Sequence, residues 1–129
     1  EIESVCDGSH NIGRTIVRRN ENKVAYTEEM DNNIQLMMNL VDKAIQQMID
    51  ALENDDVSYE ELIRSKNTEN EINNFRNRLK TQNILDINSK KYKYQISVTY
   101  MDIIIECEKM GDYIINILEA LHQTPNLHV

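Results

Sequence analysis

The feature that most constrains the fold is an apolar stripe that returns every three or four residues between Met30 and Leu52. Its members are Met30, Ile34, Met37, Val41, Ala44, Met48 and Leu52. Apolar residues at this period lie on one face of an α-helix, so the stripe predicts a helix that packs in a bundle. The 129 residues include only 3 Gly, 1 Pro, 1 Phe and no Trp. With so few turn makers and strong strand formers, we predict an all-α fold.

The remaining segments fit the same architecture. We expect four helices, at about 1–20, 27–54, 58–81 and 90–123. Thr27 is expected to cap the second helix, and Ser58 with Glu61 forms a capping box that opens the third. Residues 82–89 have the composition of a connector, and Pro125 lies beyond the end of the last helix. Short connectors between successive helices favour one domain, an antiparallel up-and-down four-helix bundle.

Charge and cysteine content exclude several classes of function. The chain has 14 Lys and Arg against 22 Asp and Glu, a net charge of −8, which argues against a nucleic-acid partner because such partners require a basic face. Cys6 and Cys107 have neither the number of a disulfide framework nor the spacing of a zinc site, so we expect them to fill apolar positions. No apolar run approaches the roughly 20 residues that span a bilayer.

Two stretches of the chain share a Glu, an Asp and an Asn at successive four-residue steps. They are Glu3, Asp7 and Asn11 near the start, and Glu108, Asp112 and Asn116 near the end. Composition alone predicts roughly 0.1 such triplets, so two of them are a signal. Four residues correspond to slightly more than one helical turn, so each triplet forms a row along one helix face.

The two rows suggest a cation site. If their helices meet, four carboxylates converge, and their mutual repulsion and burial would raise their pKa values. A divalent cation relieves that repulsion, with Asn11 and Asn116 as neutral oxygen ligands or as groups that orient the carboxylates. The alternative is that both rows simply face water.

The residues around the second row point to a family. Glu108-Lys-Met-Gly-Asp112-Tyr-Ile-Ile-Asn116-Ile117 resembles the Glu-Arg-x-Gly-Asp-x-x-x-Asn-Ile signature of PhoU-type domains. Glu3-Ser-Val-Cys-Asp7-Gly-Ser-His-Asn11-Ile12 is similar to the equivalent motif in the first half of those domains. PhoU proteins consist of two three-helix repeats, each with Glu-x-x-x-Asp on its third helix. On that template, residues 1–20 are the end of the third helix, and residues 27–123 are helices four to six.

The basic residues between Arg14 and Arg19 make the start of the chain resemble the cytoplasmic C-terminal domain of bacterial sodium/phosphate cotransporters. The resemblance implies a regulator of phosphate uptake rather than an enzyme, located on the cytoplasmic side of the inner membrane. Its expected partner is the transmembrane transporter domain of the same chain. Because the first residue is Glu rather than Met and stands just before a motif, we expect a fragment of a longer protein.

The resemblance also implies metal ligands. They are Glu3, Asp7, Glu108 and Asp112, for a divalent ion such as Fe, Zn, Mn or Mg. The chain departs from the family pattern, however. Lys109 and Ser4 replace the Arg that follows each Glu, and Cys6 replaces the Gly of the first motif. These departures weaken the case for a metal more than the case for the fold.

Three other interpretations compete. The chain could be a metal-free helical module for docking or homo-oligomer formation, or a free-standing PhoU-type regulator. A di-metal oxidase in a four-helix bundle needs two Glu-x-x-His pairs on different helices. Only Glu119 and His122 fit that spacing, and just before Pro125 we expect them to be frayed and solvated. The sequence therefore predicts no enzymatic activity.

Overall fold

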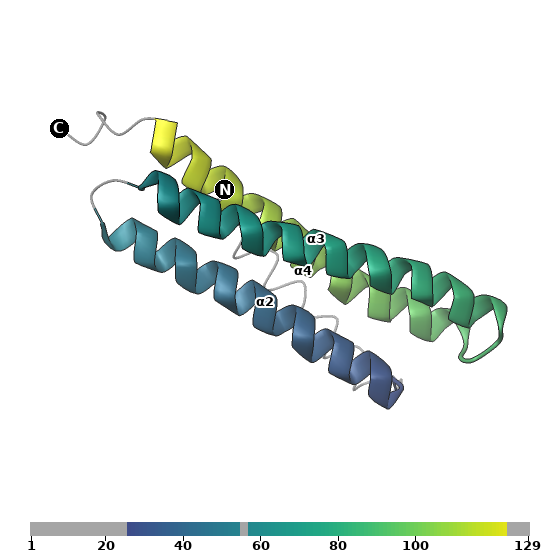
Figure 1. Cartoon of the computed structure of the whole chain (residues 1–129). Coiled ribbons are helices and arrows are strands. Elements are labelled where there is room, and N and C mark those ends of the chain that lie inside the picture. The colour runs from purple at the N-terminus through teal and green to yellow at the C-terminus, as the bar shows by residue number, and fades with distance from the viewer. Residues whose placement is uncertain (1–25, 55–56, 124–129) are drawn as a thin grey trace.

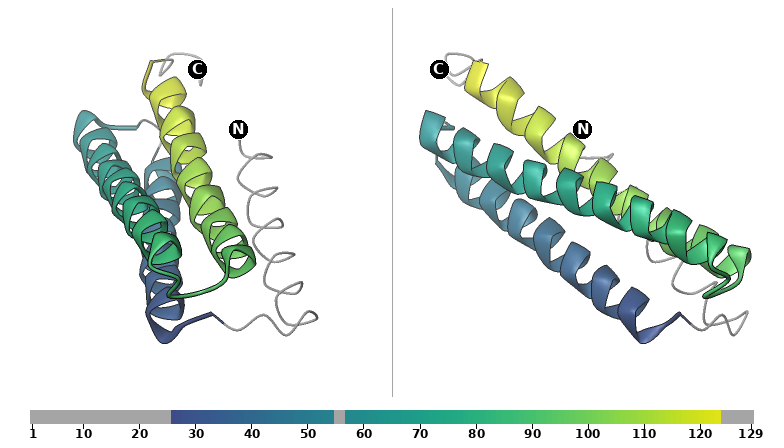
Figure 2. Two further views of the ribbon diagram at one scale, coloured as in Figure 1. Left: turned by 90° about the vertical axis from the view of Figure 1, so that its right-hand side faces the viewer. Right: turned by 45° about the vertical axis from the view of Figure 1, so that its right-hand side comes forward.

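The computed structural model describes residues 26–54 and 57–123, and most of these belong to three long helices. The helices are α2 (Glu28–Glu53), α3 (Tyr59–Asn88) and α4 (Tyr94–Gln123). Figure 1 shows α3 running back along α2, and α4 returning in the direction of α2. Each helix packs against both of the others, around one shared interior (Figure 2). The all-α prediction is confirmed. The predicted four-helix bundle is not, because the helix expected at 1–20 lies outside the described residues.

Helix α2 follows the predicted apolar stripe closely. Thr27 caps it, with its Oγ1 accepting a hydrogen bond of 3.1 Å from the backbone N–H of Met30. The stripe is buried from Met30 to Met48, but its last buried member is Ala51, and Leu52 is exposed. A step of three from Met48 keeps the residue on the buried face, whereas a step of four turns it outward.

Helix α3 is longer than the sequence predicts. It begins after Ser58, whose Oγ accepts from the N–H of Glu61 at 3.1 Å, so this part of the predicted capping box is confirmed. The predicted connector at 82–89 is wrong, because the helix continues through Asn88. Its buried face extends from Leu79 through Asn83 and Asp86, two polar residues whose burial a hydrophobic pattern does not reveal.

A tight turn at 89–93 separates α3 from α4. Lys90 has a φ of 59°, in the left-handed region, and the backbone N–H of Lys91 donates to the carbonyl of Asp86. Helix α4 therefore starts at Tyr94, a few residues later than the sequence predicts. The Tyr92 hydroxyl donates to Oδ1 of Asn83, which ties the turn to the buried polar residues of α3.

Helix α4 supplies much of the core. Its buried apolar residues are Tyr100, Met101, Ile103, Ile104, Cys107, Met110, Ile114, Ile115, Ile117 and Leu118. They cover more than one stripe because both α2 and α3 pack against this helix. Cys107 fills an apolar position as predicted, whereas Cys6 lies outside the described residues. None of the three helices is both long enough and apolar enough to cross a membrane, as far as the described ranges extend.

Helices α3 and α4 approach closely at Gly111. A Cβ added to this glycine would lie 3.2 Å from Cδ1 and 3.7 Å from Cγ2 of Ile72. Because Ile72 is fully buried, it has little room to retreat. The glycine thus allows a close contact between the two helices, next to Asp112 on α4 and Asn73 on α3.

Candidate functional site

The second acid row lies on the side of α4 that faces α3. Glu108 and Asp112 are one turn apart there, and both are half-buried. Helix α3 places Glu69, Asn73 and Arg76 opposite them. Steps of four and three residues keep these α3 side chains on one face. The contact at Gly111 brings this face near the acid row, so the site joins residues from two helices.

The carboxylates of this site repel one another. Burial raises the pKa of Glu69, and the negative charge of Asp112 raises it further. Burial also raises the pKa of Glu108, together with a hydrogen bond and a charge interaction with Asp112. The positive charge of Arg76 acts in the opposite direction and lowers the pKa of Glu108. The site therefore holds more negative charge than its single guanidinium neutralises.

Two buried polar atoms of α3 lack a hydrogen-bond partner at this site. The Nδ2 group of Asn73 donates to Oε1 of Glu69 at 3.5 Å, but Oδ1 of the same side chain accepts no hydrogen bond. The Nε of Arg76 is also unpaired. Leaving a buried polar group without a partner costs about 1–3 kcal/mol. A ligand that donates to or coordinates the amide oxygen of Asn73, or that accepts from the Nε–H of Arg76, would remove part of this cost.

The donor atoms fit a hard divalent cation in their chemistry. Carboxylate oxygens from Glu69, Glu108 and Asp112 and the unpaired amide oxygen of Asn73 are the ligand types that Mg²⁺, Mn²⁺ and Ca²⁺ prefer. Their arrangement is less favourable. Within residues 26–54 and 57–123, no three acidic, His or Cys side chains are grouped so that they could hold a metal ion.

The remaining residues expected at the site are either exposed or outside the described part of the chain. Asn116 is on α4 but exposed. Glu3, Asp7 and Asn11 lie outside the described residues, so whether the two rows meet stays a prediction.

The Glu-x-x-His pair at the end of α4 is partly solvated, with the Glu119 side chain 40% exposed, but it is not frayed as the sequence predicts, because the helix continues through Gln123. Nδ1 of His122 lies 2.8 Å from the backbone oxygen of Val57, and the ring is half-buried. Glu119 forms an ion pair of 3.5 Å with Lys66 of α3. The two side chains tie α4 to its surroundings through separate partners, which gives no support to an oxidase centre.

Comparison with known families decides what kind of bundle this is. The family model described as the PhoU domain matches residues 34–121. The chain belongs to the PhoU domain family. The match runs from the first turns of α2 almost to the end of α4, and it includes all five residues of the α3–α4 site. Neither curated proteins nor solved structures yielded a match to this chain.

Membership in the PhoU family bears on several predictions. It confirms the resemblance that the Glu108 motif suggested, and it agrees with an all-helical fold. PhoU domains are regulatory and not enzymatic, and they are linked to phosphate transport.

The sequence did not reveal the α3 half of the site. Glu69 and Asn73 stand four residues apart like Glu108 and Asp112, and that spacing is the signal that could have identified them.

Proposed function

We propose that this PhoU domain regulates a sodium-dependent phosphate transporter, and that the acidic α3–α4 site is its cation-sensitive element. The observation that carries the proposal is the electrostatic interaction of Glu69 and Glu108 with Asp112 within the PhoU match, beside the unpaired oxygen of Asn73. The transporter context is supported by the resemblance of the first motif and its basic residues to the cytoplasmic domain of such cotransporters.

A divalent cation would act through the packing of α3 against α4. Without it, the carboxylates of Glu69, Glu108 and Asp112 oppose the contact between the two helices. A cation held between them removes that repulsion and stabilises the packed state. A ligand shifts a conformational equilibrium only by the difference in its affinity for the two states, and this site would provide such a difference. The surface presented to the transporter would then depend on cation occupancy.

A metal-free docking module is the second candidate function. One observation favours it: no group of three acidic, His or Cys side chains suited to a metal occurs in the described ranges. In that case the half-buried carboxylates of Glu69 and Glu108 would receive a basic side chain of the partner instead of a cation. Both candidates place the regulatory contact on the same face of the bundle.

Phosphate uptake by intact cells tests the proposed function. The native gene is replaced by a copy that encodes Glu69→Gln and Glu108→Gln, and uptake of radiolabelled phosphate is measured with and without sodium. The matched control carries Glu60→Gln and Glu71→Gln, which remove the same charge from exposed positions of α3. We expect the first variant to lose the adjustment of sodium-dependent uptake to phosphate supply, and the control to retain it. Normal adjustment in the site variant would refute the proposal.

A further inference from the structure

Apolar side chains remain exposed along one side of α3 and α4. They are Ile84 of α3 and Tyr94, Val98 and Ile105 of α4, each between 37% and 68% exposed. Exposed apolar side chains that gather on one surface mark a place where another molecule binds. We refer to these four residues as the outer patch.

The outer patch lies on the side of the bundle away from α2. On α3, Thr68 bonds to α2, and Ile84 points about 160° away from Thr68 around the helix. On α4, Tyr100 accepts a hydrogen bond from α2, and Val98 points about 160° away from Tyr100. The patch therefore belongs to the outer side of the α3–α4 pair.

The two helices bring parts of the patch to one level. Gly111 of α4 lies against Ile72 of α3, and the two helices run in opposite directions (Figure 1). About twelve residues from this contact along each helix, Ile84 therefore lies level with Val98. These two side chains flank the same part of the contact between α3 and α4.

The patch leads to the acidic site. Val98, Ile105 and Asp112 follow one another at seven-residue steps, two helical turns each, so they form one line along α4. On α3, Ile84 lies three turns beyond Asn73 and within about 20° of it around the helix. An apolar surface about 10 Å long thus continues into the carboxylates of the site.

The acidic end of this surface suits a positively charged side chain. The site holds more negative charge than Arg76 neutralises, and Oδ1 of Asn73 is a buried acceptor without a donor. Lysine and arginine side chains carry hydrogen-bond donors and no acceptor, and their hydrogen bonds to carboxylates are assisted by charge. The surface therefore offers an apolar contact at one end and a site for a cationic group at the other.

We infer that the outer patch and the acidic site together bind a basic amphipathic helix of a partner protein. The apolar stripe of that helix would cover the patch, and a lysine or arginine about two turns further along would reach Glu108 and Asp112. Basic amphipathic helices are typical of segments that lie along a membrane surface, which agrees with a transporter as partner. A second copy of this chain is a poorer fit, because it carries a net charge of −8.

Two lysines border the surface. Lys80 is exposed on α3, one turn from Ile84 and one turn from Arg76. Its charge would repel a basic helix, so Lys80→Gln should strengthen binding. Lys109 forms an ion pair of 3.6 Å with Glu106, which neutralises its charge on α4.

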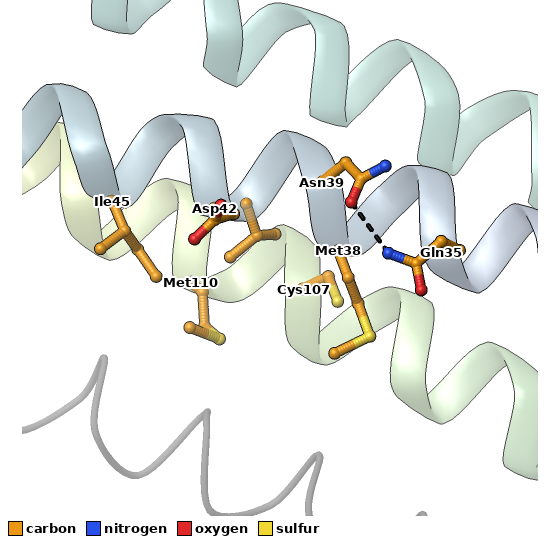
Figure 3. A pocket seen from close by; sticks show the side chains of 8 residues that line it. Gln35, Met38, Asn39, Asp42, Ile45, Cys107 and Met110 are labelled. Atoms are coloured by element: carbon orange, nitrogen blue, oxygen red, sulfur yellow. Dashed lines mark hydrogen bonds between the residues drawn. The ribbon is translucent and has the colours of Figure 1, made fainter.

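The groove between α2 and α4 is a separate apolar surface. It has a volume of about 400 Å³, and Figure 3 shows Met38, Ile45 and Met110 beside it. Met110 points about 140° away from Ile105 around α4, so a helix bound on the outer patch would not contact the groove. Residues of the groove therefore serve as controls.

The link to regulation rests on the function proposed above. A divalent cation held by Glu69, Glu108 and Asp112 would occupy the carboxylates that receive the lysine of the partner. The cation and the partner helix would therefore compete, and each would lower the affinity of the other by the same factor. The partner would bind when the site is free of cation.

Fluorescence anisotropy of a labelled peptide tests the inference on the full chain. The peptide is an alanine-rich helix with leucines at every third or fourth position over two turns, and two lysines two turns further on the same face. Ile84→Ser/Val98→Ser removes two side chains that are 51% and 40% exposed. The matched control, Met38→Ser/Leu85→Ser, removes two that are 36% and 56% exposed, from the groove and from another side of α3. Circular dichroism verifies that both variants are as helical as the parent.

We expect Ile84→Ser/Val98→Ser to bind the peptide about tenfold more weakly than the chelator-treated parent, and the control to bind like the parent. A peptide with glutamines in place of both lysines should also bind the parent about tenfold more weakly. Equal binding by the outer-patch variant and the parent, weaker binding only in the control, or no binding to the parent would overturn the inference. A parent dimer that dissociates in Ile84→Ser/Val98→Ser, measured by sedimentation, would assign the patch to a second copy and would also overturn it.

Addition of Mn²⁺ or Mg²⁺ separates this inference from the proposed function. We expect a cation that stabilises the parent to weaken peptide binding. Peptide binding of the expected pattern that no cation changes would retain the docking surface and refute the role of the cation. Cation-dependent stability without peptide binding would retain the cation site and refute the docking surface.

Discussion

The contact between Gly111 and Ile72 makes a quantitative prediction, because it holds α3 and α4 together at the acidic site. Replacing Gly by Ala inside a helix contributes about 1 kcal/mol to stability through helix propensity. The added Cβ, however, would meet Cδ1 of Ile72 at 3.2 Å, closer than an ordinary contact. Overpacking of a buried site costs about 1–3 kcal/mol. Gly111→Ala alone should therefore leave stability unchanged or reduce it.

Removing the obstructing methyl group isolates the clash. Ile72→Val deletes Cδ1, and the nearest remaining contact of the new Cβ is Cγ2, at an ordinary 3.7 Å. On its own this substitution should cost about 0.5–1.5 kcal/mol. In the Ile72→Val background, Gly111→Ala should show its full gain of about 1 kcal/mol from helix propensity. The two substitutions should thus be coupled by about 1 kcal/mol or more.

Urea unfolding followed by far-UV circular dichroism measures this coupling. The four proteins of the cycle are the parent, both single variants and the double variant, compared by their free energies of unfolding. Gly111→Val serves as a check, because a larger side chain should destabilise in either background. Equal effects of Gly111→Ala in the parent and in the Ile72→Val variant would refute the claim that Ile72 limits the approach of the two helices.

Four further predictions concern the site and the helix ends. Because the pKa of Glu108 is raised in the folded state, its ionisation lowers the free energy of unfolding at neutral pH, and Glu108→Gln should stabilise the chain there. This stabilisation should decrease as the pH falls through the raised pKa and should be absent below 4.5, where Glu108 is protonated in both states. Unfolding curves across that range check the sign. Arg76→Gln should raise the pKa of Glu108 further, measured by NMR titration, and an unchanged pKa would exclude their interaction. His122→Ala should lose about 1 kcal/mol with the hydrogen bond to Val57, and stability equal to the parent would contradict that bond. Thr27→Ala should cost about 1 kcal/mol, whereas Thr27→Gly should cost only a few tenths, because glycine is tolerated at helix caps.

The sequence predicts those parts of the fold where burial coincides with hydrophobicity. The stripe from Met30 to Met48 reveals α2 because every buried member is apolar. A hydrophobic pattern does not predict the end of α3, because the buried face of this helix continues through the polar residues Asn83 and Asp86. Their burial depends on partners such as the Tyr92 hydroxyl, which approaches only after the chain has reversed.

The sequence likewise predicts only the α4 part of the candidate site. Glu108 and Asp112 stand out in the sequence because their spacing recurs near the start of the chain. Glu69 and Arg76 stand out less, because α3 is polar on most of its surface and the four-residue step from Glu69 to Asn73 does not recur elsewhere as a matching row. Residues that act across two helices are identified only once the packing of those helices is known.

Cation-dependent unfolding tests the central claim most directly. The chain is first treated with a chelator, and thermal unfolding is then followed with Mn²⁺, Zn²⁺, Fe²⁺ or Mg²⁺. A cation that binds only the folded chain, at 100 times its dissociation constant, should add about 2.7 kcal/mol, or about 10 °C. We predict this shift for the parent and for Glu60→Gln/Glu71→Gln, and its loss in Glu69→Gln/Glu108→Gln. No shift with any cation, or the same shift in both double variants, would contradict a cation site between α3 and α4.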